Sequence, residues 1–120
     1  MSISGSCHCG NISFEARHAP DFLVACNCSL CRRLGALWTH TATENVTILR
    51  SGGGTRPYVW GDRTLEVHSC ENCGCVTHWE NLQPEKRDVI AVNMRLARPD
   101  VMARLPVRNF DGADSGEFID

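Results

Sequence analysis

The stretch CNCSLC, residues Cys26 to Cys31, places three thiols within six residues. Two further clusters flank it along the chain, CHC at Cys7–Cys9 and CENCGC at Cys70–Cys75. Together the three clusters hold all eight cysteines of the 120-residue chain. These sulfurs can form disulfides, bind metal or take part in catalysis. The choice between these roles decides how the chain folds and what it does.

Composition limits the class of protein before any motif is considered. The length predicts a single domain over residues 1–120, with a loosely ordered acidic tail at about 111–120. The net charge of −2 does not indicate nucleic acid or a membrane surface as a partner. The N-terminus lacks a charged-then-apolar leader, and no apolar run approaches the ~18 residues of a membrane span. We therefore expect a cytoplasmic protein, in which thiols stay reduced.

The spacing of the cysteines favours metal binding over disulfides. The members of each C-x-C pair, Cys7/Cys9 and Cys26/Cys28, are too close along the chain to bridge each other easily. Clusters of C-x-C and C-x-x-C are the arrangement in which tetrahedral zinc collects thiolates. Zinc is the predicted metal, and iron is the alternative because four thiolates also hold iron.

The apolar pattern is mostly short and strand-like. It predicts strands at Asn11–Ala16, Phe22–Ala25, Leu37–Thr41, Val46–Arg50, Arg56–Trp60, Leu65–Ser69, Val76–Glu80 and Val89–Asn93. Helix is confined to two predicted turns, one at Ser29–Leu34 with Ser29 as N-cap and Gly35 as stop, and one at Pro99–Leu105. The sequence therefore predicts a mainly β, antiparallel fold with its cysteines at strand ends and turns.

The cysteines can be assigned to two metal sites by considering which of them can meet around one ion. A closed structural zinc takes four protein ligands, whereas a reactive zinc usually takes three and keeps a position open. Two ligands from each of two distant segments make the most stabilising closed site, because they close a long loop. The residues that fit this role are Cys7, Cys9, Cys70 and Cys73. The residues that can bind a second metal by themselves are Cys26, Cys28 and Cys31.

Several residues near these clusters allow two interpretations. Cys75 is either a fourth ligand of the second site or a small core residue or free thiol; its position just beyond a ligand of the first site favours the latter. Arg32 and Arg33 either steer a carboxylate-bearing thiol or form an exposed helical face. His68 and His78 are interpreted as half-buried packing residues rather than ligands.

The aromatic residues and the remaining histidines give weaker signals. The three tryptophans occupy predicted strand positions and are interpreted as core; they are Trp38, Trp60 and Trp79. A general acid or base would assist addition to a carbonyl group, and the pattern does not single out one histidine for that role.

With the clusters placed, the sequence resembles the glutathione-dependent formaldehyde-activating enzyme (GFA) family, also called the centromere protein V family. The matching segments run in order along nearly the whole chain: GSCHCGNISFEA, CNCSLCRRLGA, SGGGTRPYVWG before HSCENCG, and VNMRL followed by VRNFDG. The resemblance implies zinc-stapled antiparallel sheets of the β-tent type. It also implies two zinc ions per chain. The structural ion would be held by Cys7, Cys9, Cys70 and Cys73, and the labile, catalytic ion by Cys26, Cys28 and Cys31.

The resemblance also implies an activity. The family's founding reaction joins glutathione and formaldehyde to give S-hydroxymethylglutathione, and the family is described as carbon–sulfur lyases. We therefore expect a zinc-dependent carbon–sulfur lyase whose partner is a small-molecule thiol such as glutathione. The chain departs from the family pattern at Cys75, and at His68, where an aromatic residue often precedes the C-x-x-C. The alternative function is a zinc-stabilised binding module without turnover.

Overall fold

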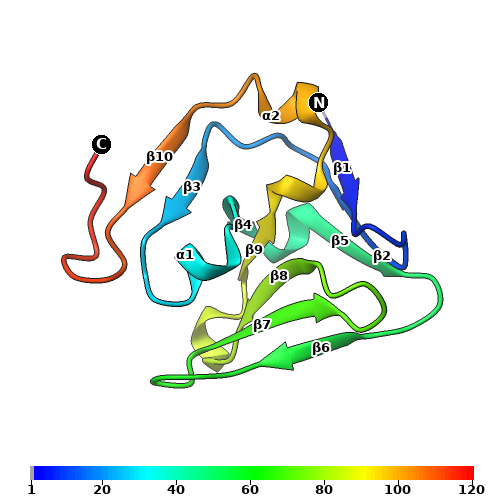
Figure 1. Ribbon diagram of the computed structural model, residues 1–120, viewed down its shortest axis with the longest axis horizontal. Helices are drawn as coiled ribbons and strands as arrows, with labels where there is room; N and C mark the ends of the chain where they lie inside the picture. The colour runs from blue at the N-terminus through cyan, green and yellow to red at the C-terminus, as the bar shows by residue number, and fades with distance from the viewer. Residues whose placement is uncertain (1) are drawn as a thin grey trace.

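A computed structural model describes residues 2–120, and its strands form two sheets (Figure 1). The smaller sheet is antiparallel, with strand order β1–β2–β5, and consists of β1 (Ile3–Ser6), β2 (Ile12–Ala16) and β5 (Val46–Arg50). The larger sheet has the order β10–β3–β4–β9–β8–β7–β6. Its strands are β3 (Leu23–Cys26), β4 (Trp38–Ala42), β6 (Thr55–Tyr58), β7 (Leu65–Cys70), β8 (Val76–Asn81), β9 (Val89–Asn93) and β10 (Val107–Phe110).

Helical structure in the described residues is confined to short turns. The α-helical turns are α1 (Cys31–Leu34) and α2 (Pro99–Met102), and the 3₁₀ turns are η1 (Thr43–Asn45), η2 (Pro84–Lys86) and η3 (Met94–Leu96). The prediction of a mainly β fold with short helical turns is therefore confirmed. Within residues 2–120, no helix has the length and apolar character required to cross a membrane.

The sequence pattern did not predict β1 or β10, each only four residues long. β10 pairs with β3 in parallel, so the larger sheet is mixed rather than purely antiparallel. A parallel pair needs a long connection, and here most of the chain separates the two strands. Local alternation of apolar residues carries no information about such a distant partner.

The first helical turn begins later than predicted. Its N-cap is Leu30, without a side-chain cap, so the prediction of Ser29 as N-cap was wrong. The backbone N–H of Cys31, which a cap at Ser29 would have bound, instead donates to Cys28 Sγ at 3.3 Å. The predicted stop is confirmed, since Gly35 follows the turn in the left-handed conformation with φ of 66°.

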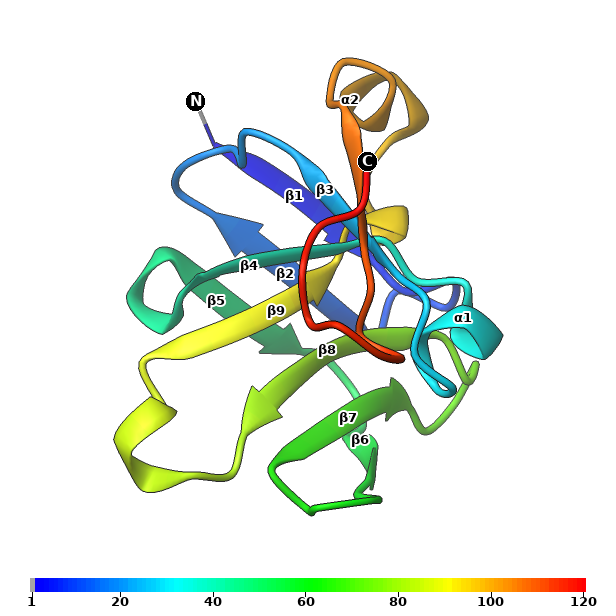
Figure 2. The same ribbon diagram turned by 90° about the vertical axis from the view of Figure 1, so that its left-hand side faces the viewer.

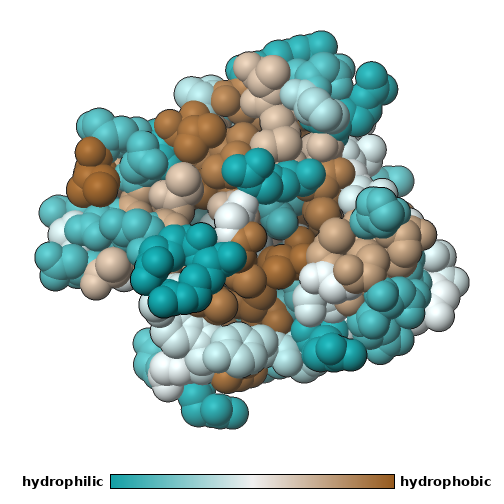
Figure 3. All heavy atoms as spheres, in the orientation of Figure 1, coloured by the Kyte–Doolittle hydropathy of each residue, from teal (hydrophilic) through white to brown (hydrophobic). Residues whose placement is uncertain are grey.

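The core lies on both faces of the larger sheet. Along β3, Leu23 packs with Phe14 of the smaller sheet, whereas its neighbour Val24 packs with Trp38 on the opposite side. β9 alternates in the same way, with Val92 on the first side and Ala91 on the second. Central strands buried on both faces are apolar without interruption, as these two strands are. Figure 3 shows further hydrophobic residues near the centre of one face, surrounded by hydrophilic ones.

The C-terminal residues fold back along β10, close to the loop that precedes α1 (Figure 2). The Ile119 backbone N–H donates to the Asn109 carbonyl at 2.9 Å. The Phe118 ring packs edge-on against Phe110, with 5.2 Å between ring centroids. The Arg108 guanidinium lies 3.9 Å from the centroid of the Phe118 ring and pairs with Asp120 at 3.2 Å.

The smaller sheet depends on a close approach of the chain at Gly5. A Cβ atom at this position would lie 2.5 Å from the Leu96 carbonyl oxygen and 2.7 Å from the Phe14 ring. We expect Gly5→Ala to lower the free energy of unfolding by about 1–3 kcal/mol through overpacking, measured by urea unfolding at fixed zinc. The matched control is Gly52→Ala, where the nearest atom would be Asn11 Oδ1 at 3.5 Å. Equal stability of the two variants would contradict the packing described here.

Candidate metal centres and active-site cavity

Two turns of the same kind bring four thiols together. One follows β1 with the sequence CHCG, and the other follows β7 with the sequence CENCG. Each ends in a glycine in the left-handed conformation, Gly10 with φ of 83° and Gly74 with φ of 80°. The Gly10 N–H donates to the Cys7 carbonyl at 3.1 Å, and the Gly74 N–H donates to the Cys70 carbonyl at 2.8 Å. The two turns, which belong to different sheets and differ by one residue in length, are thus each closed by a hydrogen bond from a left-handed glycine.

The four sulfurs of these turns have the geometry of a metal site. They belong to Cys7, Cys9, Cys70 and Cys73 and lie within 4.8 Å of one another. The sulfur–sulfur distance is 3.7 Å between Cys7 and Cys9 and 3.6 Å between Cys9 and Cys70. Tetrahedral coordination with zinc–sulfur bonds of about 2.3 Å places sulfurs about 3.8 Å apart. The donor set can therefore hold a metal ion, and its spacing fits zinc.

Backbone amides favour the thiolate form that a metal requires. The N–H groups of Cys75 and Cys9 lower the pKa of the Cys73 thiol to about 5. The N–H groups of Cys73 and Asn72 lower the pKa of Cys70 as well. Ile12 N–H donates to Cys7 Sγ at 3.3 Å. The contacts to Cys70 come from its own turn, whereas the Cys9 N–H reaches Cys73 from the other turn, so the site is completed only when the two turns meet.

Cys75 lies beside this four-cysteine group and not at the middle cluster. It is half-buried and packs against the buried residues Cys7, Ile12 and Cys70. Its carbonyl accepts from the Cys70 N–H at 2.8 Å and so helps to close the turn after β7. Its sulfur is outside the mutually close set of four.

The middle cluster forms a second group of thiols. The sulfurs of Cys26, Cys28 and Cys31 lie within 4.8 Å of one another, and all three residues are half-buried. Burial raises the pKa of Cys26 and of Cys31. Burial also opposes ionisation of Cys28, but hydrogen bonds led by the Cys31 N–H outweigh it and lower the pKa of Cys28. Cys28 is therefore the thiol of the cluster that ionises most readily.

The C-terminal segment packs against the middle cluster and forms hydrogen bonds with the loop that carries it. Asn27, between the first two cysteines, donates through Nδ2 to Asp111 Oδ1 at 2.9 Å, and its Oδ1 accepts from the Ala113 N–H at 3.0 Å. Gly112 is so close that an added Cβ would lie 2.5 Å from Cys26 Sγ. Sequence reasoning missed these roles, although the segment VRNFDG was among those that resemble the family.

A cavity of about 790 Å³ opens beside the middle cluster. All three thiols of the cluster line it, and six of the other sixteen lining residues are aromatic: Phe22, Trp38, Trp60, Trp79, Phe110 and Phe118. The interpretation of the tryptophans as core was incomplete for Trp38 and Trp79, which are buried and also line the cavity, and wrong for Trp60, which is exposed. Its charged lining residues are Asp21 and Asp62, and no lysine or arginine of residues 2–120 lines it.

Two polar groups belong to residues of the cavity wall. Trp38 Nε1 is buried, forms no hydrogen bond of standard geometry among the described residues, and lies near the Cys31 thiol, whose ionised form it favours. The His40 ring packs against Trp79 with 5.4 Å between centroids, and burial lowers the pKa of His40. The sequence did not distinguish His40 from the other histidines, because its place in the cavity depends on the pairing of β4 with β9.

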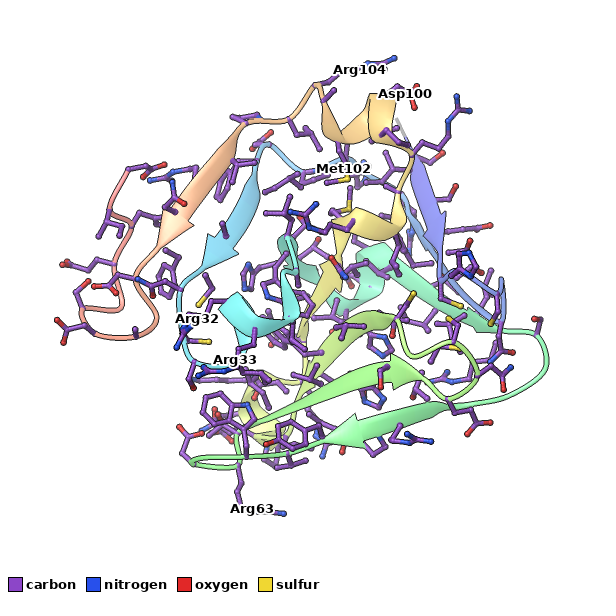
Figure 4. All side chains as sticks on the ribbon, viewed as in Figure 1. Arg32, Arg33, Arg63, Asp100, Met102 and Arg104 are labelled. Atoms are coloured by element: carbon purple, nitrogen blue, oxygen red, sulfur yellow. The ribbon has the colours of Figure 1, made fainter. Side chains whose placement is uncertain are left out.

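Arg32 and Arg33 form an exposed helical face. Figure 4 labels both on α1, next to the middle cluster along the chain. Neither side chain lines the cavity. Arg33 instead donates through Nη1 to the Ser29 carbonyl at 2.7 Å. Of the two interpretations of these residues, the structure favours the exposed face over contact with a ligand in the cavity.

Comparison with known proteins identifies the family. The family model for the glutathione-dependent formaldehyde-activating enzyme matches residues 2–104, and the chain belongs to this family. The fold is similar to the crystal structure of a Rhodobacter sphaeroides protein, with a TM-score of 0.69 and 25% sequence identity. That match covers 88% of this chain and 99% of the other. The family match ends before β10, so the segment that packs against Cys26 lies beyond it.

The contact between Gly112 and Cys26 leads to a test of the middle cluster. We expect Gly112→Ala to lower the amount of zinc retained there, because the added methyl group displaces Cys26 Sγ. The four-cysteine group should keep its ion, so native mass spectrometry should show one zinc per chain lost and one kept. The control is Gly54→Ala, where the nearest atom, Glu71 Oε2, would be 3.9 Å away. Full zinc content in Gly112→Ala would contradict this arrangement.

Proposed function

We propose that this chain is a zinc-dependent carbon–sulfur lyase that acts on thiol adducts, such as the S-hydroxymethylglutathione formed from glutathione and formaldehyde. The observation that carries the proposal is the position of Cys26, Cys28 and Cys31 on the wall of a large cavity. A site with three protein ligands and access to a ligand cavity is the arrangement of catalytic zinc, whereas a closed structural site has four. Membership of the family supports the same reaction class.

The two groups of thiols have different roles in this proposal. Zinc held by Cys7, Cys9, Cys70 and Cys73 is structural. Zinc held by Cys26, Cys28 and Cys31 is labile and would supply the positive charge that keeps a substrate thiol deprotonated at neutral pH. Three thiolate ligands make such a site better suited to soft sulfur than to the activation of water.

The reaction itself needs no oxidant or reductant. The thiolate sulfur of the substrate attacks the carbonyl carbon, a carbon–sulfur bond forms, and the π electron pair moves to the oxygen, which takes up a proton. The reverse reaction breaks the carbon–sulfur bond and returns the thiol and the aldehyde. His40, which is exposed on the cavity wall, is the group of the cavity that can carry the proton.

The role of the middle cluster is tested by Cys28→Ser. We expect this variant to lose catalysis of exchange between free and thiol-bound formaldehyde, because the most readily ionised ligand is gone. Exchange NMR with labelled formaldehyde and glutathione measures the rate above the uncatalysed reaction. The matched control is Cys75→Ser, which removes a cysteine outside both groups and should retain activity. Equal activity of Cys28→Ser and wild-type protein would overturn the proposal, and a wild-type rate no faster than the uncatalysed one would favour a zinc-stabilised binding module.

The cavity wall also indicates which thiols fit best. Six aromatic side chains can bury an apolar group, whereas the two carboxylates of glutathione would face Asp21 and Asp62 without an arginine or lysine beside them. We infer that adducts of thiols with an apolar or aromatic group are better substrates than the glutathione adduct.

This inference is tested with phenylmethanethiol and glutathione as alternative thiols. We expect kcat/KM for phenylmethanethiol to be about ten-fold higher, because burial of its ring contributes at least about 1.5 kcal/mol. Trp60→Ala should reduce this preference, whereas Tyr58→Ala, on the same hairpin but outside the cavity, should not. Asp21→Asn should raise kcat/KM for glutathione alone, by about 2- to 5-fold. A preference of the wild-type protein for glutathione would contradict the inference.

A further inference from the structure

One face of the β7–β8 hairpin carries two histidines and two glutamates in a square. The strand register pairs Glu66 with Glu80 and His68 with His78. Alternate residues of a strand share a face, so these four side chains lie on the same side of the hairpin. We call Glu66, His68, His78 and Glu80 the histidine–glutamate square. The intervening pair, Val67 and Trp79, points to the opposite side, into the core beside the cavity.

The histidines of the square are buried and their Nε2 atoms face carboxylates. His68 is 7% exposed and His78 is 0% exposed, and their rings stack at 4.6 Å between centroids. His78 Nε2 lies 3.2 Å from Glu80 Oε1. His68 Nε2 lies 2.8 Å from Glu66 Oε1 and 3.9 Å from Glu80 Oε2. The two ring nitrogens and the carboxylates therefore converge on one small region at the surface of the hairpin.

One tautomer of His78 leaves its Nε2 without a proton. In this tautomer the Thr77 hydroxyl donates its single proton to the His68 carbonyl at 3.3 Å. The 2.8 Å contact between Thr77 Oγ1 and His78 Nδ1 is then one in which the ring N–H donates. In the neutral ring, the Nε2 lone pair consequently faces the oxygen of Glu80. Burial opposes the binding of a second proton to the ring. A metal cation between Nε2 and the Glu80 oxygen would therefore satisfy both the lone pair of the ring and the charge of the carboxylate.

His68 has the same pattern. Its Nδ1 lies 2.6 Å from Thr55 Oγ1, which leaves Nε2 as the atom directed toward the carboxylates. Nε2 is buried and has no hydrogen-bond partner among the described residues, because Glu66 Oε1, although close, lies outside hydrogen-bond geometry. Each histidine thus has a threonine hydroxyl on Nδ1 and an Nε2 directed toward a carboxylate, as in histidines that bind metal through Nε2.

The carboxylates of the square also lack a compensating charge. Glu66 and Glu80 are directly opposite in an antiparallel pair, where like charges destabilise the hairpin. Among residues 2–120, no lysine or arginine forms a salt bridge with either of them. A β-bulge lies beside the His68–His78 pair, where the register shifts between His68 and Ser69. Thr77 is the extra residue of this bulge, and its hydroxyl contacts the His68 carbonyl and His78 Nδ1.

We propose that His68, His78 and Glu80 bind a divalent transition-metal ion, with Glu66 within reach as a further carboxylate. The ligand atoms of the first three lie within 4.8 Å of one another. Imidazole and carboxylate donors suit zinc, cobalt, nickel, manganese or ferrous iron, in contrast to the thiolates of the other two groups. Glu80 is 48% exposed at its side chain, so the ion enters from solvent and keeps positions open to it. This site is independent of the reaction proposed above.

The proposal is tested by titrating zinc-loaded protein with cobalt. Bound cobalt is counted by equilibrium dialysis and elemental analysis, and its ligands are identified by absorption. We expect one cobalt per chain in addition to the zinc already bound. It should show weak d–d bands and no sulfur-to-cobalt charge-transfer band, because the site has nitrogen and oxygen ligands. No additional cobalt at millimolar concentration, or a charge-transfer band that grows with the additional ion, would overturn the proposal.

Variants within the square separate metal binding from folding. Glu80→Gln and His68→Gln should each weaken cobalt binding by about ten-fold or more, with the zinc content unchanged. The matched control is Glu85→Gln, which removes an exposed carboxylate in η2 and should bind cobalt like the wild-type protein. Glu80→Gln keeps a side chain of the same shape at a partly exposed position, so its fold should survive. Wild-type affinity in Glu80→Gln would overturn the proposal.

Discussion

The arrangement of this protein depends on the meeting of two hairpin turns from different sheets. The turn after β1 and the turn after β7 each end in a left-handed glycine and together place four sulfurs at the spacing of a tetrahedral ion. Cys9 and Cys70 are 61 residues apart along the chain, and an ion that joined them would contribute about 4 kcal/mol by lowering the entropy of the unfolded state. Such an ion would fix the smaller sheet and the β7–β8 hairpin relative to each other. Both the cavity and the histidine–glutamate square depend on where this hairpin lies.

The β7–β8 hairpin connects three features of the molecule. Its turn supplies Cys70 and Cys73, one face contributes Trp79 to the cavity, and the other face carries the histidine–glutamate square. The bulge at Thr77 lies between the turn that carries Cys73 and the square. The shift in register at the bulge separates the cysteines of the turn from the histidines and glutamates of the square. An ion in the square would oppose the repulsion between Glu66 and Glu80 and so stabilise the same hairpin that carries the cavity wall.

Much of the site could be predicted from the sequence, because cysteines that can bind metal occur at short, characteristic spacings such as C-x-C and C-x-x-C. The grouping of Cys7 and Cys9 with a later C-x-x-C was inferred because two distant pairs can meet around one ion. The middle cluster was inferred because three cysteines so close along the chain can bind one ion by themselves. The square could not be found in this way, since it depends on the register of β7 against β8. A slip of one residue would move His68 to the opposite face. The role of the tryptophans was missed for another reason: an apolar side chain gives the same pattern whether it faces the core or a cavity.

The middle cluster and one part of the cavity wall come from different segments of the chain. The thiols of the middle cluster fall within residues 2–104, which the family model matches, whereas Phe110, Gly112 and Phe118 fall outside that range. These three residues come from the segment that folds back along β10 and is tied to the cluster through Asn27. The middle cluster and most of the cavity wall thus lie within the residues that the family model matches, and one part of the wall comes from the segment after them. Because Asn27 connects that segment directly to the loop of the cysteines, a change in the C-terminal segment alters the shape of the cavity and the packing around Cys26 together.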